Sequence, residues 1–281
     1  MMLVLFALVS VPLAGQETGI GRKHHPWGRC APGAWKIVRV LTKSLDDRGE
    51  PGPSSTTETK TTLTDIGDAG VVLEVKVCVE LGGKHFDSEP QTIRQGYHGE
   101  QTNEMLKPKD LGTGTLTIDE QKIACRIEKI ETLNANTKTA TTTYFSDTLA
   151  PYVLKRESVT TDLDGKTVLG ETLVEVTALN MPCDVLGEIK SAAEVRTVYK
   201  HTNGTSITLA FVCGDVPGGI VSHTSKELDK SGRLVRMSVL KLVGYSFDPE
   251  EERTGLFGRK RPTRFRKTTS HLLPGASPPE G

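Results

Sequence analysis

The chain has 281 residues, with 35 basic and 35 acidic side chains and a formal net charge of zero. This balance leaves no global field that would attract nucleic acid or an acidic surface, so specific nucleic-acid binding is not expected. Hydrophobic residues make up 36% of the chain and aromatic residues only 5%, which suits an antiparallel sheet with one face in water.

The N-terminal residues 1–14, MMLVLFALVSVPLA, form an apolar run that is too short to span a bilayer, which takes about 20 residues. The run resembles the apolar region of a secretory signal peptide, with cleavage near Ala14, and a buried N-terminal strand is the alternative. We therefore expect an exported protein, periplasmic or secreted, with no transmembrane segment after cleavage. Residues 15–29 are polar and Gly-rich and include His24-His25-Pro26-Trp27, and we expect them to form a flexible, solvated lead-in.

From Trp35 onwards, extended runs alternate with turn residues. Trp35 to Leu45 and Ser55 to Asp65 are predicted strands, and Val71 to Leu81 shows the clearest period of two. That period places one set of apolar side chains on a single face of the strand: Val71, Leu73, Val75, Val77, Val79 and Leu81. The short turns between these runs predict a meander, in which neighbours in sequence are neighbours in the sheet.

The middle of the chain reads as a series of hairpins. Ala150 to Leu179 contains two extended runs around Asp164-Gly165, a dipeptide that tolerates positive φ. Lys122 to Leu133 fits either a helix or a strand, and the turn and Thr-rich run that follow it favour a strand. Asn203-Gly204 predicts another tight turn, and Asp229 to Gly232 turns the last hairpin.

These patterns predict a mainly β protein. We expect one domain over residues 30–246, an antiparallel, strongly curved sheet of half-barrel or open-barrel form with little helix. Residues 247–281 combine Pro, Gly and dense charge, cannot support a core, and are expected to be a disordered tail.

The five cysteines are widely spaced and include no CxxC pair. In an exported protein, one or two disulfides are allowed with one Cys left over, and the connectivity cannot be read from the spacing of Cys30, Cys78, Cys125, Cys183 and Cys213. Cys78 and Cys213 lie in apolar strand patterns and fit small buried hydrophobes equally well. Because the histidines do not cluster with them, we do not expect a zinc site.

No catalytic, cofactor or metal motif stands out, and we predict a protein that is not an enzyme. Ser222 and His223 are adjacent, but adjacent residues of a strand point to opposite faces and cannot form a nucleophile–base pair. His223 and Glu227 have the spacing of a metal pair on a helix, whereas on a strand that spacing is about 13 Å, too far for one ion.

A curved antiparallel sheet with an apolar face can enclose an apolar cavity. The candidate lining residues are Leu73, Val75, Val77 and Val79 from one strand, Val174 and Val176 from a second, and Val235, Met237 and Val239 from a third. Within each group the residues are two apart, so they share a face of their strand. The alternative is that they form an ordinary core.

Trp35 opens the first strand, and Cys125-Arg126-Ile127 is followed by Tyr144-Phe145-Ser146-Asp147 and then by Pro151 with Lys155 and Arg156. In this order, over about Trp35 to Tyr245, the chain resembles the LolA/LolB-like superfamily of periplasmic lipoprotein carriers, in particular its uncharacterised exported half-barrel members. The resemblance implies the half-barrel fold, and no functional residue is carried over from it.

Taken together, the sequence predicts an exported, non-catalytic binding protein for a lipid, a lipoprotein or another envelope component. A structural or interaction β module without a ligand cavity is the alternative. A hydrolase whose catalytic residues lie far apart in sequence is a third possibility, which only convergent His and carboxylate side chains would support.

Overall fold

The computed structural model describes residues 19–100 and 108–248. The predicted signal peptide, residues 1–14, lies outside the described residues, as does all of the predicted tail except Phe247 and Asp248. In the described part, no helix is long and apolar enough to cross a membrane.

The described chain is built almost entirely from strands, and its helical content is the short 3₁₀ turn η1 (Arg22–His24). The first strands are β1 (Trp35–Leu45), β2 (Pro51–Gly67), β3 (Gly70–Leu81), β4 (Lys84–Asp87) and β5 (Gln91–Gln95). The next are β6 (Lys109–Ile118), β7 (Gln121–Leu133), β8 (Thr137–Phe145), β9 (Val153–Asp162) and β10 (Val168–Val185). The last are β11 (Glu188–His201), β12 (Gly204–Val212), β13 (Ile220–Asp229) and β14 (Leu234–Ser246).

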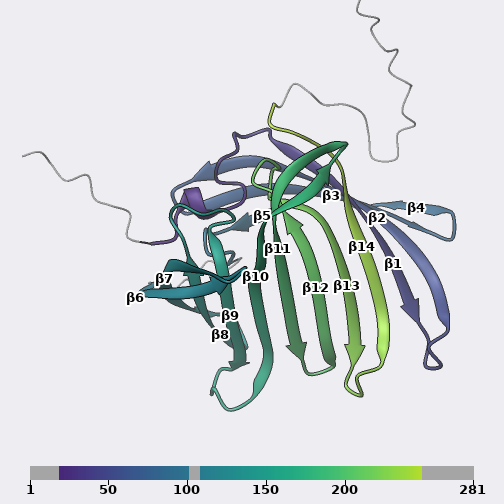
Figure 1. Ribbon diagram of the computed structural model, residues 1–281. Coiled ribbons are helices and arrows are strands. Elements are labelled where there is room, and N and C mark those ends of the chain that lie inside the picture. The colour runs from purple at the N-terminus through teal and green to yellow at the C-terminus, as the bar shows by residue number, and fades with distance from the viewer. Residues whose placement is uncertain (1–18, 101–107, 249–281) are drawn as a thin grey trace, which may run out of the picture.

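All fourteen strands belong to one antiparallel sheet in the order β4-β3-β2-β1-β14-β13-β12-β11-β10-β9-β8-β7-β6, with β5 paired to β3 beside β4. Apart from the β1–β14 pairing, neighbours along this path are consecutive in sequence, as expected of a meander. Figure 1 shows the strands side by side in a strongly curved sheet. The predicted fold class is confirmed.

The predicted turns lie at the ends of hairpins. Asp164-Gly165 connects β9 to β10, and Gly165 has a φ of 69°, a conformation that glycine adopts without a steric penalty. Asp162 Oδ1 accepts a hydrogen bond from the backbone N–H of Lys166 at 2.8 Å, which closes the same loop. Asn203-Gly204 turns the chain from β11 into β12, as predicted.

The sheet curls so that one face lies inside. Phe145 on β8 is fully buried in the same core cluster as Leu63 on β2 and Leu73 on β3, although these strands lie far apart in the sheet order. The segment before β1 contributes Ile20 and Trp27 to the same cluster, and Tyr97, after β5, also belongs to it. We call the enclosed side the concave face and the other side the outward face.

Two further segments cover one end of the concave face. The β10–β11 hairpin end packs Cys183 and Val185 against Leu240 and Leu242 of β14 and Val221 of β13. The β6–β7 hairpin packs Ile118 and Cys125 against Leu154, Val176 and Ala193. The apolar core is therefore concentrated at this covered end.

The lead-in was expected to be flexible and solvated, and for residues 19–29 that expectation is wrong. His24, Trp27 and His25 are 2%, 5% and 6% exposed, and Ile20 and Trp27 belong to the main core cluster. The segment bridges β2 and β3 to β7 and β8, so burial of its polar residues depends on partners more than 100 residues away.

Candidate functional site

The concave face carries a continuous row of hydroxyl side chains across six strands. Residues paired directly across an antiparallel ladder point to the same side of the sheet, so the register identifies the row. From β10 to β3 it runs through Val174, Thr197, Thr208, Ser225, Ser238, Thr42, Ser55 and Leu81. The members from Thr197 to Ser55 are half-buried, and Thr208 donates a hydrogen bond to Ser225 at 2.9 Å.

The next row on the concave face, on the side of the hydroxyl row towards the covered end, is mostly apolar. It runs through Val176, Val195, Ala210, His223, Leu240, Val40, Thr57 and Val79. Val176, Ala210 and Leu240 are buried, and burial lowers the pKa of His223, so its imidazole is neutral at pH 7.

The row on the open side is polar and reaches the rim. It runs through Thr172, Tyr199, Ser206, Glu227, Arg236 and Ser44. Arg236 Nη1 lies 3.3 Å from Glu227 Oε2, and the Tyr199 ring stacks on His201 with centroids 5.1 Å apart. Side chains therefore change from apolar through hydroxyl to charged between the covered end and the rim, and we call these three rows the graded trough.

The predicted lining residues Leu73, Val75, Val77, Val79, Val174 and Val176 all lie on the concave face. Leu73 and Val176 are buried, and the other four are half-buried. The structure does not bring the two groups into one cluster, because Leu73 packs with Phe145 and Val176 packs with the β6–β7 hairpin.

The third predicted lining group, Val235, Met237 and Val239, does not lie on the concave face, and that prediction is wrong. Met237 pairs with Lys43 and Val239 pairs with Leu41, whereas the intervening Ser238 pairs with Thr42 of the hydroxyl row. Met237 and Val239 are each 39% exposed on the outward face. The period of two indicated that they share a face, but it could not indicate which face was covered.

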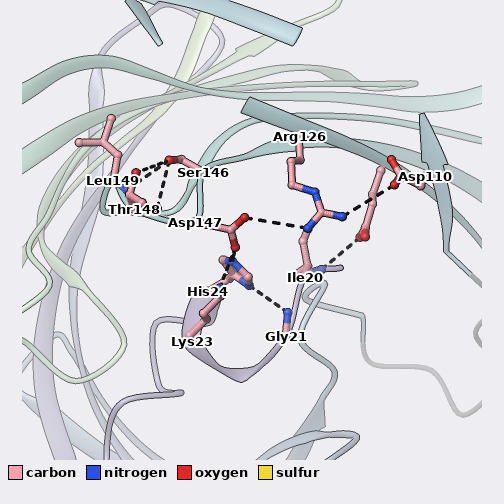
Figure 2. Close-up of polar contacts among 11 residues, drawn as sticks. Ile20, Gly21, Lys23, His24, Asp110, Arg126, Ser146, Asp147, Thr148 and Leu149 are labelled. Atoms are coloured by element: carbon pink, nitrogen blue, oxygen red, sulfur yellow. Dashed lines mark hydrogen bonds and ion pairs between the residues drawn. The ribbon is translucent and has the colours of Figure 1, made fainter. Parts of the chain in front are cut away.

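A polar junction lies where the lead-in meets β7 and the residues just after β8 (Figure 2). His24 Nδ1 accepts a hydrogen bond from the backbone N–H of Gly21 at 3.0 Å, so its Nε2 carries the proton and donates to Asp147 Oδ1 at 3.0 Å. Burial lowers the pKa of His24, which keeps the ring neutral. With both nitrogens engaged, His24 has no free lone pair to serve as a base or a metal ligand.

Asp147 is the centre of this junction. Lys23 Nζ lies 2.8 Å from its Oδ1, and the hydrogen bond from Lys23 is the main reason that the pKa of Asp147 is lowered. Figure 2 shows Arg126 between Asp147 and Asp110. Its Nη1 lies 3.9 Å from Asp147 Oδ2, and its Nη2 lies 3.7 Å from Asp110 Oδ2. The cluster ties three separate segments together.

A second, buried carboxylate, Glu128 on β7, holds the start of the lead-in. Glu128 is 4% exposed and accepts hydrogen bonds from the backbone N–H of Ile20 at 3.3 Å and from His98 Nε2 at 3.1 Å. His98 follows β5, so this pair joins the edge of the sheet at β5 to β7. The arrangement latches a curled sheet, and it offers no nucleophile beside a base.

In the described residues, no group of three or more His, Cys, Asp or Glu side chains is placed to hold a metal ion. All five cysteines are free and buried. Cys183 and Cys213 share one core cluster, and burial raises the pKa of the Cys183 thiol, which makes it a poor nucleophile.

Comparison with known proteins adds little. No protein-family model matches the chain, and no curated protein matches it. Among solved structures, a Bacteroides fragilis protein described as a candidate exported protein with a YmcC-like fold matches with a TM-score of 0.30 and 10% identity, over 76% of this chain and 97% of that one. A likeness this weak carries no argument, and the resemblance to the LolA/LolB-like superfamily stays a prediction.

Proposed function

We propose that this chain is an exported, non-catalytic binding protein that holds a lipid or similar amphiphile on its concave face. The graded trough is the observation that supports this ligand class. An apolar chain would lie against the row of Val195, Leu240 and Val40, and a polar headgroup would meet the hydroxyl row and the Glu227–Arg236 pair at the rim. Pockets for such ligands combine an apolar lining with a few placed polar groups.

Export rests on the sequence, through the apolar run at residues 1–14. A lipoprotein or another envelope component would engage the same face through its acyl chains. The competing function is a structural β module, in which half-buried Ser and Thr simply face water along the open part of the sheet.

Titration of the full chain with a fluorescent fatty acid, in the absence of membranes, tests the proposal. Ser225→Trp places an indole in the graded trough, and Thr224→Trp places the same group on the outward face of the same strand. Because the indole would occupy the space of the ligand, Ser225→Trp should weaken binding more than about tenfold. A tenfold loss in affinity corresponds to about 1.4 kcal/mol of binding free energy. Thr224→Trp should bind as the wild type does.

Equal affinity of the two variants, or no saturable binding by the wild type, would contradict the proposal and leave the structural module as the better account. Circular dichroism of both variants would confirm that each retains the β fold.

A further inference from the structure

The outward face of β12, β13, β14 and β1 carries apolar side chains that stay exposed in the described part of the chain. Leu41 pairs with Val239, Val239 lies opposite Thr224, and Thr224 lies opposite Leu209, which makes one row across four adjacent strands. Leu41, Leu209 and Val239 are 53%, 44% and 39% exposed. These four strands lie side by side in Figure 1.

Lysines surround these apolar side chains. Lys43, Lys226 and Lys241 are exposed on the same face, and among the described residues none of the three has an ion-pair partner. The three neighbouring outward rows contain no Asp or Glu: Arg39, Lys241, Ser222 and Phe211; Leu41, Val239, Thr224 and Leu209; and Lys43, Met237, Lys226 and Ile207. We call this surface of twelve residues the basic apolar face.

Two of the acidic side chains that flank it are paired with arginines. On one side, Arg39 Nε donates to Glu58 Oε1 at 2.7 Å, and Glu58 is 2% exposed. On the other side, Arg196 Nη1 donates to Glu175 Oε1 at 3.0 Å. Glu194, opposite Phe211, is half-buried and accepts a hydrogen bond from Thr177 Oγ1 at 2.7 Å. The face therefore presents a net positive charge around an apolar centre, although the whole chain is formally neutral.

The geometry restricts what can cover this face. All four strands are paired on both sides, so an extended peptide cannot add to them as a further strand. A second copy docking through the same face would bring lysines against lysines. A broad surface of apolar side chains interspersed with lysines matches the interfacial region of an anionic bilayer, where the apolar groups enter the headgroup layer and the ammonium groups meet lipid phosphates.

We propose that the basic apolar face docks the protein onto an anionic membrane surface. Leu41, Leu209, Met237 and Val239 enter the headgroup layer, and Lys43, Lys226 and Lys241 contact the anionic headgroups. This surface is opposite the graded trough, so docking does not require that the trough hold a ligand.

Co-sedimentation of the full chain with vesicles tests the proposal, comparing mixed phosphatidylglycerol and phosphatidylcholine with phosphatidylcholine alone. Each lysine near an anionic surface contributes about 1 kcal/mol, or about fivefold in partitioning. The variant Lys43→Gln/Lys226→Gln/Lys241→Gln should therefore bind the mixed vesicles about a hundredfold more weakly. The matched control Lys76→Gln/Lys122→Gln/Lys166→Gln has the same net charge, changes exposed lysines elsewhere, and should bind nearly as the wild type does.

A second pair of variants tests insertion without any change of charge. Leu41→Ser/Leu209→Ser should weaken binding by at least about tenfold, because apolar area no longer leaves water. Ile189→Ser, at a position that is 83% exposed away from the face, should have no effect. Absence of binding to mixed vesicles, or equal losses in the two lysine variants, would overturn the proposal. A wild type that binds vesicles but no fatty acid would leave this proposal standing and refute the one for the trough.

Discussion

Acidification should weaken the fold through His25, whose ring is buried in the lead-in. His25 is 6% exposed, its Nδ1 accepts a hydrogen bond from the backbone N–H of Trp27 at 3.3 Å, and its edge meets the Tyr97 ring at a centroid distance of 6.0 Å. Burial is the main cause that lowers the pKa of His25 from 6.5 to about 4, against a hydrogen bond with Gln95 that raises it. The folded protein thus keeps a neutral ring at a pH where the unfolded chain is protonated.

The sign and size of the effect follow from that difference. As pH falls from 7 towards 4, the unfolded chain takes up a proton at His25 and the folded chain does not, so the free energy of unfolding decreases. The decrease begins near pH 6.5, ends near pH 4, and amounts to about 3 kcal/mol for this group. Below pH 4 both states are protonated and His25 contributes no further change.

Urea unfolding followed by circular dichroism at several pH values between 7 and 4 measures this loss. His24 and His223 also have lowered pKa values, so the contribution of His25 is taken as the difference from a His25→Asn variant. The Asn side-chain carbonyl can still accept the hydrogen bond from Trp27. The variant should lose about 3 kcal/mol less than the wild type over this range, and equal losses in both proteins would refute the assignment.

Two further substitutions test the lead-in and the hairpins. Trp27→Ala removes a side chain that is 5% exposed in the main core cluster and should lower the free energy of unfolding by about 3–5 kcal/mol in urea; a loss below about 1 kcal/mol would show that the lead-in is not part of the core. Gly165→Ala should cost about 1–2 kcal/mol, because φ is 69° but a Cβ would meet nothing within 4 Å. Gly204→Ala should cost more, because φ is 153° and its Cβ would lie 1.9 Å from the Leu228 carbonyl oxygen; equal costs measured by thermal unfolding would contradict the turn geometry.

Local pattern was enough to predict the strands and several turns. The alternation over Val71 to Leu81 and the Asp164-Gly165 turn are short-range signals, and both agree with the structure. The same kind of signal could not assign Met237 to a face, since alternation identifies two faces and only the pairing with Lys43 shows which one points outward.

The buried lead-in had no local signal at all. His24 and its neighbours read as a solvated linker. They are buried because two carboxylates far along the chain accept their hydrogen bonds: Asp147, just after β8, from His24, and Glu128, on β7, from the backbone N–H of Ile20. The graded trough was missed for a related reason. Each of the six strands contributes a single Ser or Thr to the hydroxyl row, so the row can be recognised only once the register of all six is known.

The most direct test of the proposed function is native mass spectrometry of the full chain purified without added lipid. We expect the wild type and Thr224→Trp to carry an adduct with the mass of a lipid, and Ser225→Trp to carry none. Wild-type protein free of any adduct, or adducts present equally on all three proteins, would contradict the claim that the graded trough holds an amphiphile.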